Sequence, residues 1–120
     1  LIGQVIQNLL SNASRYSGTG KRIELAVQMK GKDMEFRITD YGFGIPRDQQ
    51  TKVFRKFFRA DNAIKKVPEG TGLGLYVAKS VVEASGGSIG FESREGEGST
   101  FWFTLPLAGS RPSSGEKSLV

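Results

Sequence analysis

The sequence contains no cysteine and no histidine. Without cysteine, disulfides and thiolate metal sites are excluded. Without histidine, imidazole acid–base catalysis, imidazole metal ligands and phosphohistidine on this chain are excluded as well. No apolar run approaches the ~20 residues of a membrane-spanning helix, and no signal peptide is visible. We therefore expect no direct membrane insertion of this chain.

The length of 120 residues suffices for one domain with a buried core, and 38% of the residues are hydrophobic. We expect residues 1–107 to fold and residues 108–120 to form a disordered tail, because residues 109–118 carry no aliphatic or aromatic side chain. The net charge of +5 suits an anionic ligand. No basic cluster is interleaved with stacking aromatics, so we do not expect nucleic-acid binding. The absence of a start methionine at Leu1 indicates a piece of a longer protein.

Apolar residues at helical spacing predict helices over residues 2–16 and 73–85. The glycines within residues 17–20 are expected to end the first helix. Pro46 is placed to begin a short helix that reaches about Phe57. Residues 60–71 lack periodicity and are predicted to form a loop.

Alternating apolar residues predict two strand pairs. The first has half-buried strands around residues 23–29 and 34–38, and the second has strands around 89–91 and 101–105. Tight turns join the members of each pair, which favours a mostly antiparallel sheet that helices can cover on one face. The sequence therefore predicts a two-layer α/β sandwich.

The first motif lies at residues 8–17 (NLLSNASRYS), in the first predicted helix. Asn8 and Asn12 are four residues apart, so they share one helical face with Arg15 close by. Asparagine is a mediocre helix former, and its amide can offer oxygen to a hard cation or donors to phosphate. Taken alone, the pattern is also compatible with a solvated polar face.

The second motif, residues 40–44 (DYGFG), directly follows a predicted strand. A carboxylate at a strand end can accept hydrogen bonds from an exocyclic amine, and the two glycines permit positive φ or a close backbone approach. An ordinary strand-to-loop turn is the alternative interpretation.

The third motif, residues 54–59 (FRKFFR), places three phenylalanines at helical spacing and ends in a cation. Such a stripe is most often simply core. Arg59 could nevertheless reach a phosphate group.

The fourth motif, residues 70–75 (GTGLGL), leads into a predicted helix, where free backbone N–H groups can bind phosphate. A glycine-rich hinge is the alternative, and no lysine follows as a Walker loop would require.

The four motifs in this order resemble the N, G1, F and G2 boxes of the catalytic and ATP-binding domain of sensor histidine kinases. Residues 96–106 (GEGSTFWFTLP) resemble the terminal hairpin of that family. The resemblance covers residues 1–107 and implies the Bergerat type of α/β sandwich, with a mixed, mostly antiparallel sheet and three helices on one face. Residues 60–71 would form a lid over the nucleotide.

The resemblance also implies ATP and Mg²⁺ as cofactors. Asn12 would coordinate Mg²⁺, Arg15 would contact phosphate, and Asp40 would accept the adenine amino group. The positions implied to bind the nucleotide are Asn8, Asn12, Arg15, Tyr16, Asp40, Gly42, Gly44, Ile45, Phe58, Arg59, Gly70, Thr71, Gly72, Leu73, Gly74, Leu75 and Thr100.

Asn8 and Arg15 are the implied catalytic positions. Related ATPases such as gyrase and the heat-shock chaperones carry a water-activating glutamate where this chain has Asn8, and an amide cannot take that proton. The departure favours phosphoryl transfer over hydrolysis. A hydrolase or an anti-sigma-type serine kinase on the same fold, and an interaction domain that has lost its chemistry, are the alternatives.

In this family the phosphoaccepting histidine lies on an upstream dimerisation helix, which this chain lacks. The resemblance therefore implies a parent protein that supplies the histidine-containing dimerisation domain, forms a homodimer and signals to a response regulator. The module would be cytoplasmic, and the parent would be anchored at the inner face of the cell membrane.

Overall fold

The computed structural model describes residues 1–17, 21–67 and 70–107. The predicted tail over residues 108–120 and most of the predicted helix stop over residues 17–20 lie outside the described residues. In chain order, the described elements are α1 (Ile2–Ser17), β1 (Ile23–Lys30), β2 (Asp33–Asp40), a 3-10 helix η1 (Arg47–Lys52), α2 (Asp61–Lys66), α3 (Gly74–Ala84), β3 (Ser88–Arg94) and β4 (Gly98–Pro106).

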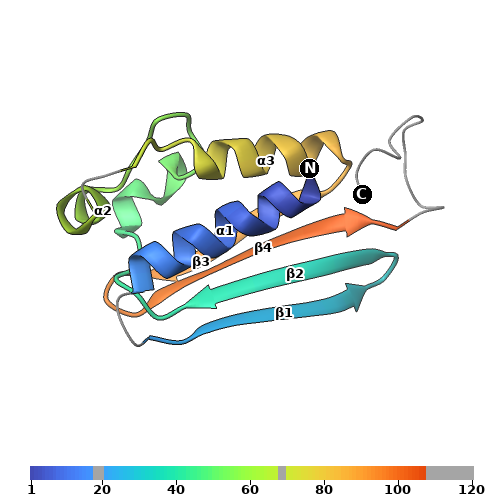
Figure 1. Ribbon diagram of the computed structural model, residues 1–120, viewed down its shortest axis with the longest axis horizontal. Helices are drawn as coiled ribbons and strands as arrows, with labels where there is room; N and C mark the ends of the chain where they lie inside the picture. The colour runs from blue at the N-terminus through green and yellow to red at the C-terminus, as the bar shows by residue number, and fades with distance from the viewer. Residues whose placement is uncertain (18–20, 68–69, 108–120) are drawn as a thin grey trace.

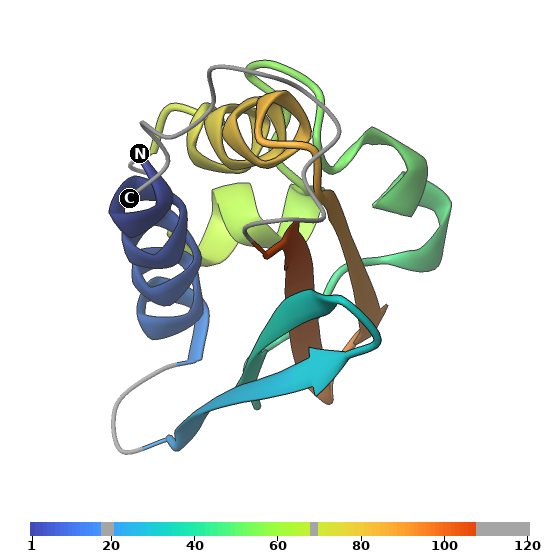
Figure 2. The ribbon, with the colours of Figure 1, turned by 90° about the vertical axis from the view of Figure 1, so that its right-hand side faces the viewer.

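The described strands form one sheet in the order β1-β2-β4-β3, and each neighbouring pair is antiparallel. Helices α1 and α3 lie side by side over one face of this sheet (Figures 1 and 2). The predicted two-layer α/β sandwich is therefore confirmed, with antiparallel pairing throughout the described strands. None of the described helices has the length and apolar character needed to cross a membrane.

The core lies between the helical layer and the sheet. Val5 and Leu9 of α1 and Val82 of α3 are buried against the sheet residues Ile38 and Phe103. The ring of Phe103 stacks on that of Phe36 with centroids 4.8 Å apart. Burial of these side chains stabilises the fold by roughly 1.5–3 kcal/mol each. The core thereby fixes α1 and α3 relative to the strand ends that carry the polar motifs.

The helix predicted from Pro46 to about Phe57 is shorter than expected, because η1 ends at Lys52. Phe57 has a φ of +67°, which no residue of a right-handed helix adopts, and its N–H donates to the Gly72 carbonyl at 2.9 Å. The phenylalanine stripe is accordingly split. Phe54 packs against the core, whereas 67% of Phe57 is exposed.

The loop predicted over residues 60–71 contains a short helix, α2. An acidic residue in its first turn and two lysines in its last turn match the helix dipole. Six residues are fewer than two helical turns, so no apolar periodicity could reveal the helix. In Figure 1, α2 lies at the left-hand end of the helical layer.

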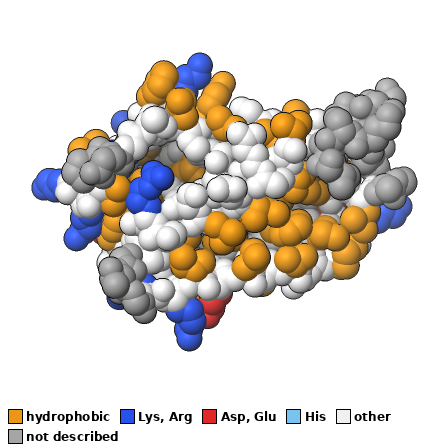
Figure 3. All heavy atoms as spheres, viewed as in Figure 1, with side chains coloured by type: hydrophobic (Ala, Val, Ile, Leu, Met, Phe, Trp, Pro, Cys, Tyr) orange, Lys and Arg blue, Asp and Glu red, His pale blue; other side chains and the backbone are white. Residues whose placement is uncertain are grey.

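Strand β1 was predicted to be half-buried, and this is wrong for its apolar residues. Leu25, Val27 and Met29 pair with Ile38, Phe36 and Met34, so they share the helix-covered face. They are nevertheless 51%, 53% and 54% exposed, respectively. The reason is that β1 is the edge strand, while α1 lies mainly over β2. Figure 3 shows hydrophobic side chains gathered in a band on this face of the molecule.

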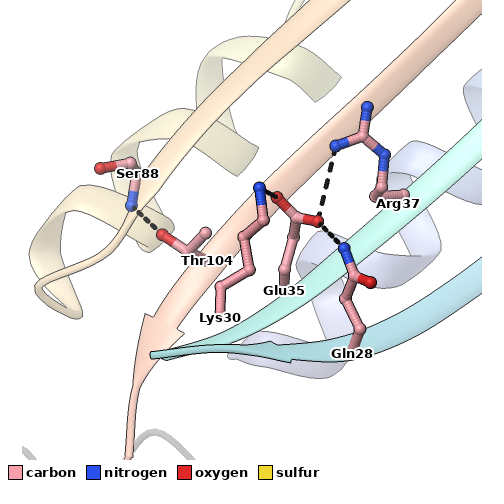
Figure 4. A network of polar contacts seen from close by, with 6 residues as sticks. All are labelled: Gln28, Lys30, Glu35, Arg37, Ser88 and Thr104. Atoms are coloured by element: carbon pink, nitrogen blue, oxygen red, sulfur yellow. Dashed lines mark hydrogen bonds and ion pairs between the residues drawn. The ribbon is translucent and has the colours of Figure 1, made fainter. Parts of the chain in front are cut away.

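The opposite face of the sheet is polar and surrounds one carboxylate. Gln28 donates to Glu35 at 2.8 Å, and Lys30 and Arg37 form ion pairs with Glu35 at 3.7 and 3.5 Å (Figure 4). The Gln28 hydrogen bond, together with the two cations, holds the pKa of Glu35 below its ordinary value despite the opposing effect of desolvation. The Glu35 carboxylate is therefore satisfied by neighbours within the sheet, on the face away from the helices.

Candidate functional site

One cavity of about 400 Å³ brings together residues from all four sequence motifs. It lies between α1, the turn after β2, the segment around α2 and the start of α3. The predicted site residues that line it are Asn8, Asn12, Arg15, Tyr16, Asp40, Gly44, Ile45, Phe58, Arg59, Gly70, Thr71, Gly72, Gly74 and Leu75. Three predicted positions, Gly42, Leu73 and Thr100, are not among the lining residues.

Thr100 is placed on the wrong face of the sheet for the predicted contact. It pairs with Thr39, and the hydroxyls of the two residues are 3.0 Å apart. Its neighbour Ser99 pairs with Asp40 and lines the cavity. Successive side chains of a strand point to opposite faces, so a prediction that is one residue out reverses the face. Ser99 takes the place that we expected for Thr100.

Gly42 and Leu73 support the cavity from outside its lining. A Cβ on Gly42 would lie 1.9 Å from the carbonyl oxygen of Tyr16, so this glycine lets the turn approach the end of α1. Leu73 is the N-cap residue of α3, and its N–H donates to the Thr71 hydroxyl at 3.2 Å. Both residues shape the backbone around the site.

Several lining residues were not predicted: Gln7, Ser11, Phe43, Val53, Ala60, Asn62, Ala63, Ser99 and Phe101. A signal existed for Gln7 and Ser11, because successive steps of four residues lead from Gln7 to Ser11 and from Ser11 to Arg15, which places all three on one side of the same helix. Phe43 contacts Tyr16 edge to face, with ring centroids 5.1 Å apart. The residues of α2 could not be found, because the sequence did not reveal that helix.

The polar row of α1 faces the cavity with two side chains that have no partner in the described parts of the chain. Asn8 Nδ2 donates to the Gly74 carbonyl at 3.2 Å, which ties α1 to the start of α3. Among the described residues, the Asn12 and Arg15 side chains make no hydrogen bond or ion pair. An unpaired amide and an unpaired guanidinium at one wall are suited to an anionic ligand and its counter-cation.

Asp40 is a buried carboxylate at the other wall, 5% exposed. Its Oδ1 accepts the Gly42 N–H at 2.9 Å. Burial raises the pKa of Asp40, and hydrogen bonds from the backbone of Gly42 and Ser99 partly oppose this shift. A buried acceptor with remaining lone pairs is well suited to bind a ligand N–H group.

The start of α3 forms the end of the cavity near the α1 row. This helix has no side-chain cap and no acidic residue in its first turn, and Gly74 and Leu75 line the cavity. The exposed N–H groups and the dipole of such a helix start favour an anion. A Cβ built on Gly74 would meet no atom within 4 Å, so space for a ligand is open there.

Arg59 was predicted to reach phosphate. In this structure its guanidinium binds main-chain carbonyl groups in and after α2. Its Nη2 donates to the carbonyl of Ala63 at 3.3 Å and to that of Val67. Arg59 also lines the cavity. The Arg59 side chain therefore contacts both the backbone of α2 and the cavity.

The donor set fits a magnesium nucleotide. The Asn12 amide oxygen can ligate a hard cation, while Arg15 and the α3 start can hold phosphate oxygens. Asp40 can accept from a base amine. Within the described residues, no group of three or more His, Cys, Asp or Glu side chains is arranged to hold a metal ion.

The comparison with protein families places this chain in the family described as "Histidine kinase-, DNA gyrase B-, and HSP90-like ATPase", which matches residues 1–109. The chain belongs to this family. Among its relatives, it is 41% identical over 109 residues to the sensor histidine kinase AruS of Pseudomonas aeruginosa, covering 88% of this chain and 11% of AruS. It is 41% identical over 107 residues to the sensor histidine kinase WalK of Bacillus subtilis, covering 88% of this chain and 18% of WalK.

Solved structures show the same fold. The mycobacterial sensor histidine kinase MprB superposes with a TM-score of 0.74 at 32% identity, covering 92% of this chain and 71% of that chain. ShkA, solved at full length in complex with AMPPNP, superposes with a TM-score of 0.75 at 26% identity, covering 92% of this chain and 22% of that chain. The chain is thus a histidine kinase/GHKL ATPase domain of the kind found in sensor kinases, and it spans a minor part of the relatives' length.

Proposed function

We propose that this chain is the ATP·Mg²⁺-binding catalytic module of a two-component sensor histidine kinase. In this function it transfers the γ-phosphoryl group of ATP to a histidine on a separate dimerisation domain. The observation that carries the proposal is one cavity lined by a buried carboxylate, an uncapped helix start, and an amide and a guanidinium that have no partner among the described residues. The solved complex of the relative ShkA with AMPPNP supports the choice of nucleotide.

At the base end of the cavity, Asp40 accepts a hydrogen from the exocyclic amine of adenine. This interaction favours ATP over GTP, because the carbonyl oxygen of guanine would meet the carboxylate as a second acceptor. Ile45 and Phe58 provide apolar walls for the base, and Tyr16 is held in place by the ring of Phe43. The Gly42 and Ser99 N–H groups orient the carboxylate before a ligand arrives.

At the phosphate end, Asn12 and Arg15 act together with the first turn of α3. Asn12 would hold Mg²⁺, which when bound would neutralise charge on the phosphate chain. Arg15 neutralises further charge and orients the terminal phosphate. The N–H groups of the glycine-rich turn and of the α3 start provide the remaining donors. Positioning and charge stabilisation dominate catalysis of phosphoryl transfer, so these groups are what this chain contributes, while the acceptor histidine of the dimerisation domain provides the attacking nitrogen.

Asn8 decides between transfer and hydrolysis in this proposal. Its amide cannot remove a proton from water, and its Nδ2 is already bonded to the Gly74 carbonyl. We therefore assign Asn8 a bracing role between α1 and α3 and expect little hydrolysis of bound ATP. The competing function is a hydrolase or an anti-sigma-type serine kinase on the same fold.

The acceptor must come from outside the chain, because the chain has no histidine. We infer that the parent protein supplies a histidine-containing dimerisation domain, functions as a homodimer and passes the phosphoryl group to a response regulator. We also infer that the module works in the cytoplasm, in a parent anchored at the inner face of the cell membrane. The names of the relatives AruS and WalK, both sensor histidine kinases, support the inference that the parent is a sensor kinase.

Supplying the parent's histidine domain in trans with γ-labelled ATP tests the proposed function. We expect label on the acceptor histidine with the wild-type chain and none with Asn12→Ala. A folded chain that binds ATP but leaves the acceptor unlabelled would refute phosphotransfer. Steady-state phosphate release without any acceptor would favour the hydrolase instead.

A further inference from the structure

Two neighbouring side-chain contacts join the first turn of the short helix α2 to other parts of the domain. Gln49 of η1 accepts the Asp61 N–H at 2.8 Å and donates to the Asp61 carboxylate at 2.9 Å. Next to this pair, Asn62 Nδ2 donates to the Gly44 carbonyl at 2.9 Å, in the turn that follows Asp40. In the Gln49 contact both amide atoms have a partner, whereas in the Asn62 contact one of the two does not.

The Asn62 amide leaves one buried atom without a partner. Asn62 Oδ1 is buried and is the one buried side-chain nitrogen or oxygen in the described chain that lacks a hydrogen bond. Reversing the amide would not help, because Oδ1 would then face the Gly44 carbonyl, and two acceptors repel. The orientation of the amide is therefore fixed, and its oxygen stays buried without a partner in a residue that lines the cavity.

Without a ligand, the unpaired oxygen cancels the stabilisation of α2 that the Asn62 hydrogen bond would otherwise give. Leaving a buried acceptor unpaired costs at least as much as one neutral hydrogen bond gains, so the amide does not hold α2 in place by itself. A donor that reaches Oδ1 removes the cost and keeps the gain. The exocyclic amine of adenine has two hydrogens, and Asp40, which lines the same cavity, can accept only one of them.

We propose that Asn62 is a positioning residue that couples filling of the base end of the cavity to closure of α2 over it, with Oδ1 accepting the second hydrogen of the adenine amine. This inference rests on the proposed ATP binding and adds a second base-recognition group to it. Asn62 therefore lengthens the time that ATP stays bound. In the free protein, Asn62 does not stabilise the α2 position.

Hydrogen exchange of the α2 amides tests the proposal with a matched control. The amides of Ile64 and Val67 bond to the Ala60 and Ala63 carbonyls and report on α2. In Asn62→Ala we expect unchanged exchange in the free chain but about fivefold faster exchange than wild type with saturating ATP·Mg²⁺. The control Gln49→Ala removes a fully satisfied contact, so exchange should rise in both states.

Dissociation rates of two nucleotides complete the test. Asn62→Ala should release ATP about fivefold faster than wild type, and should release purine riboside triphosphate, which lacks the 6-amine, at the wild-type rate. If Asn62→Ala accelerates α2 exchange equally in the free and the ATP-bound chain, Asn62 has only a structural role and the proposal is wrong. Equal effects on both nucleotides would also overturn the proposal. If wild type binds ATP and Asn62→Ala changes nothing, this inference alone fails; if wild type binds no ATP, the proposed function fails with it.

Discussion

The side-chain amide of Asn8 donates a hydrogen bond to the main-chain carbonyl of Gly74 at 3.2 Å, across 66 positions of sequence. This contact joins the polar row of α1 to the first residue of α3, and both line the cavity. It aligns Asn12 and Arg15 with the uncapped start of α3. The geometry of the proposed phosphate end therefore depends on how α1 and α3 are placed relative to each other.

Removing this contact should affect binding more than folding. The bond is exposed, and a hydrogen bond of this kind contributes about 0.5–1.5 kcal/mol. We predict that Asn8→Ala weakens ATP·Mg²⁺ binding by roughly three- to tenfold and lowers Tm by only a few degrees. Calorimetry and thermal unfolding measure the two effects. The control is Gln4→Ala, an exposed position of α1 away from the cavity, and an equal loss of affinity in that variant would contradict the bracing role.

Two glycine substitutions should separate folding from binding. A Cβ on Gly42 would lie 1.9 Å from the carbonyl oxygen of Tyr16. Gly42→Ala should therefore destabilise the fold by about 2–4 kcal/mol. A Cβ on Gly74 meets no protein atom within 4 Å and would enter the open end of the cavity.

We therefore predict that Gly74→Ala keeps or slightly raises the free energy of unfolding, because alanine favours a helix by about 1 kcal/mol over glycine. ATP affinity should nevertheless fall about tenfold, because the methyl group occupies ligand space. Urea unfolding and nucleotide titration of both variants give the answer. Full ATP affinity in Gly74→Ala would show that the ligand does not approach the start of α3.

The raised pKa of Asp40 gives a prediction with a definite sign. A folded-state pKa above the ordinary 3.8 means that the folded chain binds this proton more tightly than the unfolded chain does. Its stabilising contribution is therefore complete below 3.8 and is lost as the pH rises through the raised pKa. Relative to Asp40→Asn, wild type should lose unfolding free energy as the pH rises above 3.8 and through the raised pKa of Asp40.

The Asp40→Asn substitution should weaken ATP binding even where it raises the unfolding free energy. At neutral pH, Asp40→Asn should bind ATP about tenfold more weakly, because one acceptor is replaced by a donor that faces the adenine amine. Urea titrations across the pH range and calorimetry at pH 7 measure the two quantities. An Asp40→Asn variant that is less stable than wild type and binds ATP with the same affinity would contradict the assigned role of Asp40.

The exposed stripe on β1 predicts self-association of the isolated chain. Leu25, Val27 and Met29 lie exposed on an edge strand, which is a template for pairing with another chain. Replacing all three with threonine should shift light-scattering mass toward the monomer at high concentration and leave ATP affinity within twofold. Unchanged association in the triple variant would show that the stripe does not cause it.

The sequence predicted most of the fold because its strongest patterns are long. The helix around Val5 and Leu9 and the strand containing Phe101 and Phe103 are each longer than two periods of their pattern and end in the core. The periodicity did not reveal that α1 leaves the edge strand uncovered. Leu25 alternates like a buried residue, and only the placement of the helices determines its exposure.

The sequence motifs single out residues by the chemistry that their side chains can supply, and the roles of these residues stay predictions. Asn12, Arg15 and Asp40 are such residues, and the structure brings them to one cavity. Thr100 was misplaced although the alternation of Phe101 and Phe103 extends to Ser99, because the family motif and not this alternation was used to choose between the two hydroxyl residues. Asn62 was missed because six-residue helices leave no periodic signal, and its stranded oxygen is visible only in three dimensions.

The most direct test of the account is a calorimetric titration of the chain with ATP in the presence of Mg²⁺, alongside Asn12→Ala. The account predicts one binding site for wild type, a loss of at least tenfold in affinity when Mg²⁺ is removed, and insensitivity of Asn12→Ala to Mg²⁺, with an unchanged unfolding curve. A folded wild-type chain that binds no ATP at millimolar concentration would contradict the account.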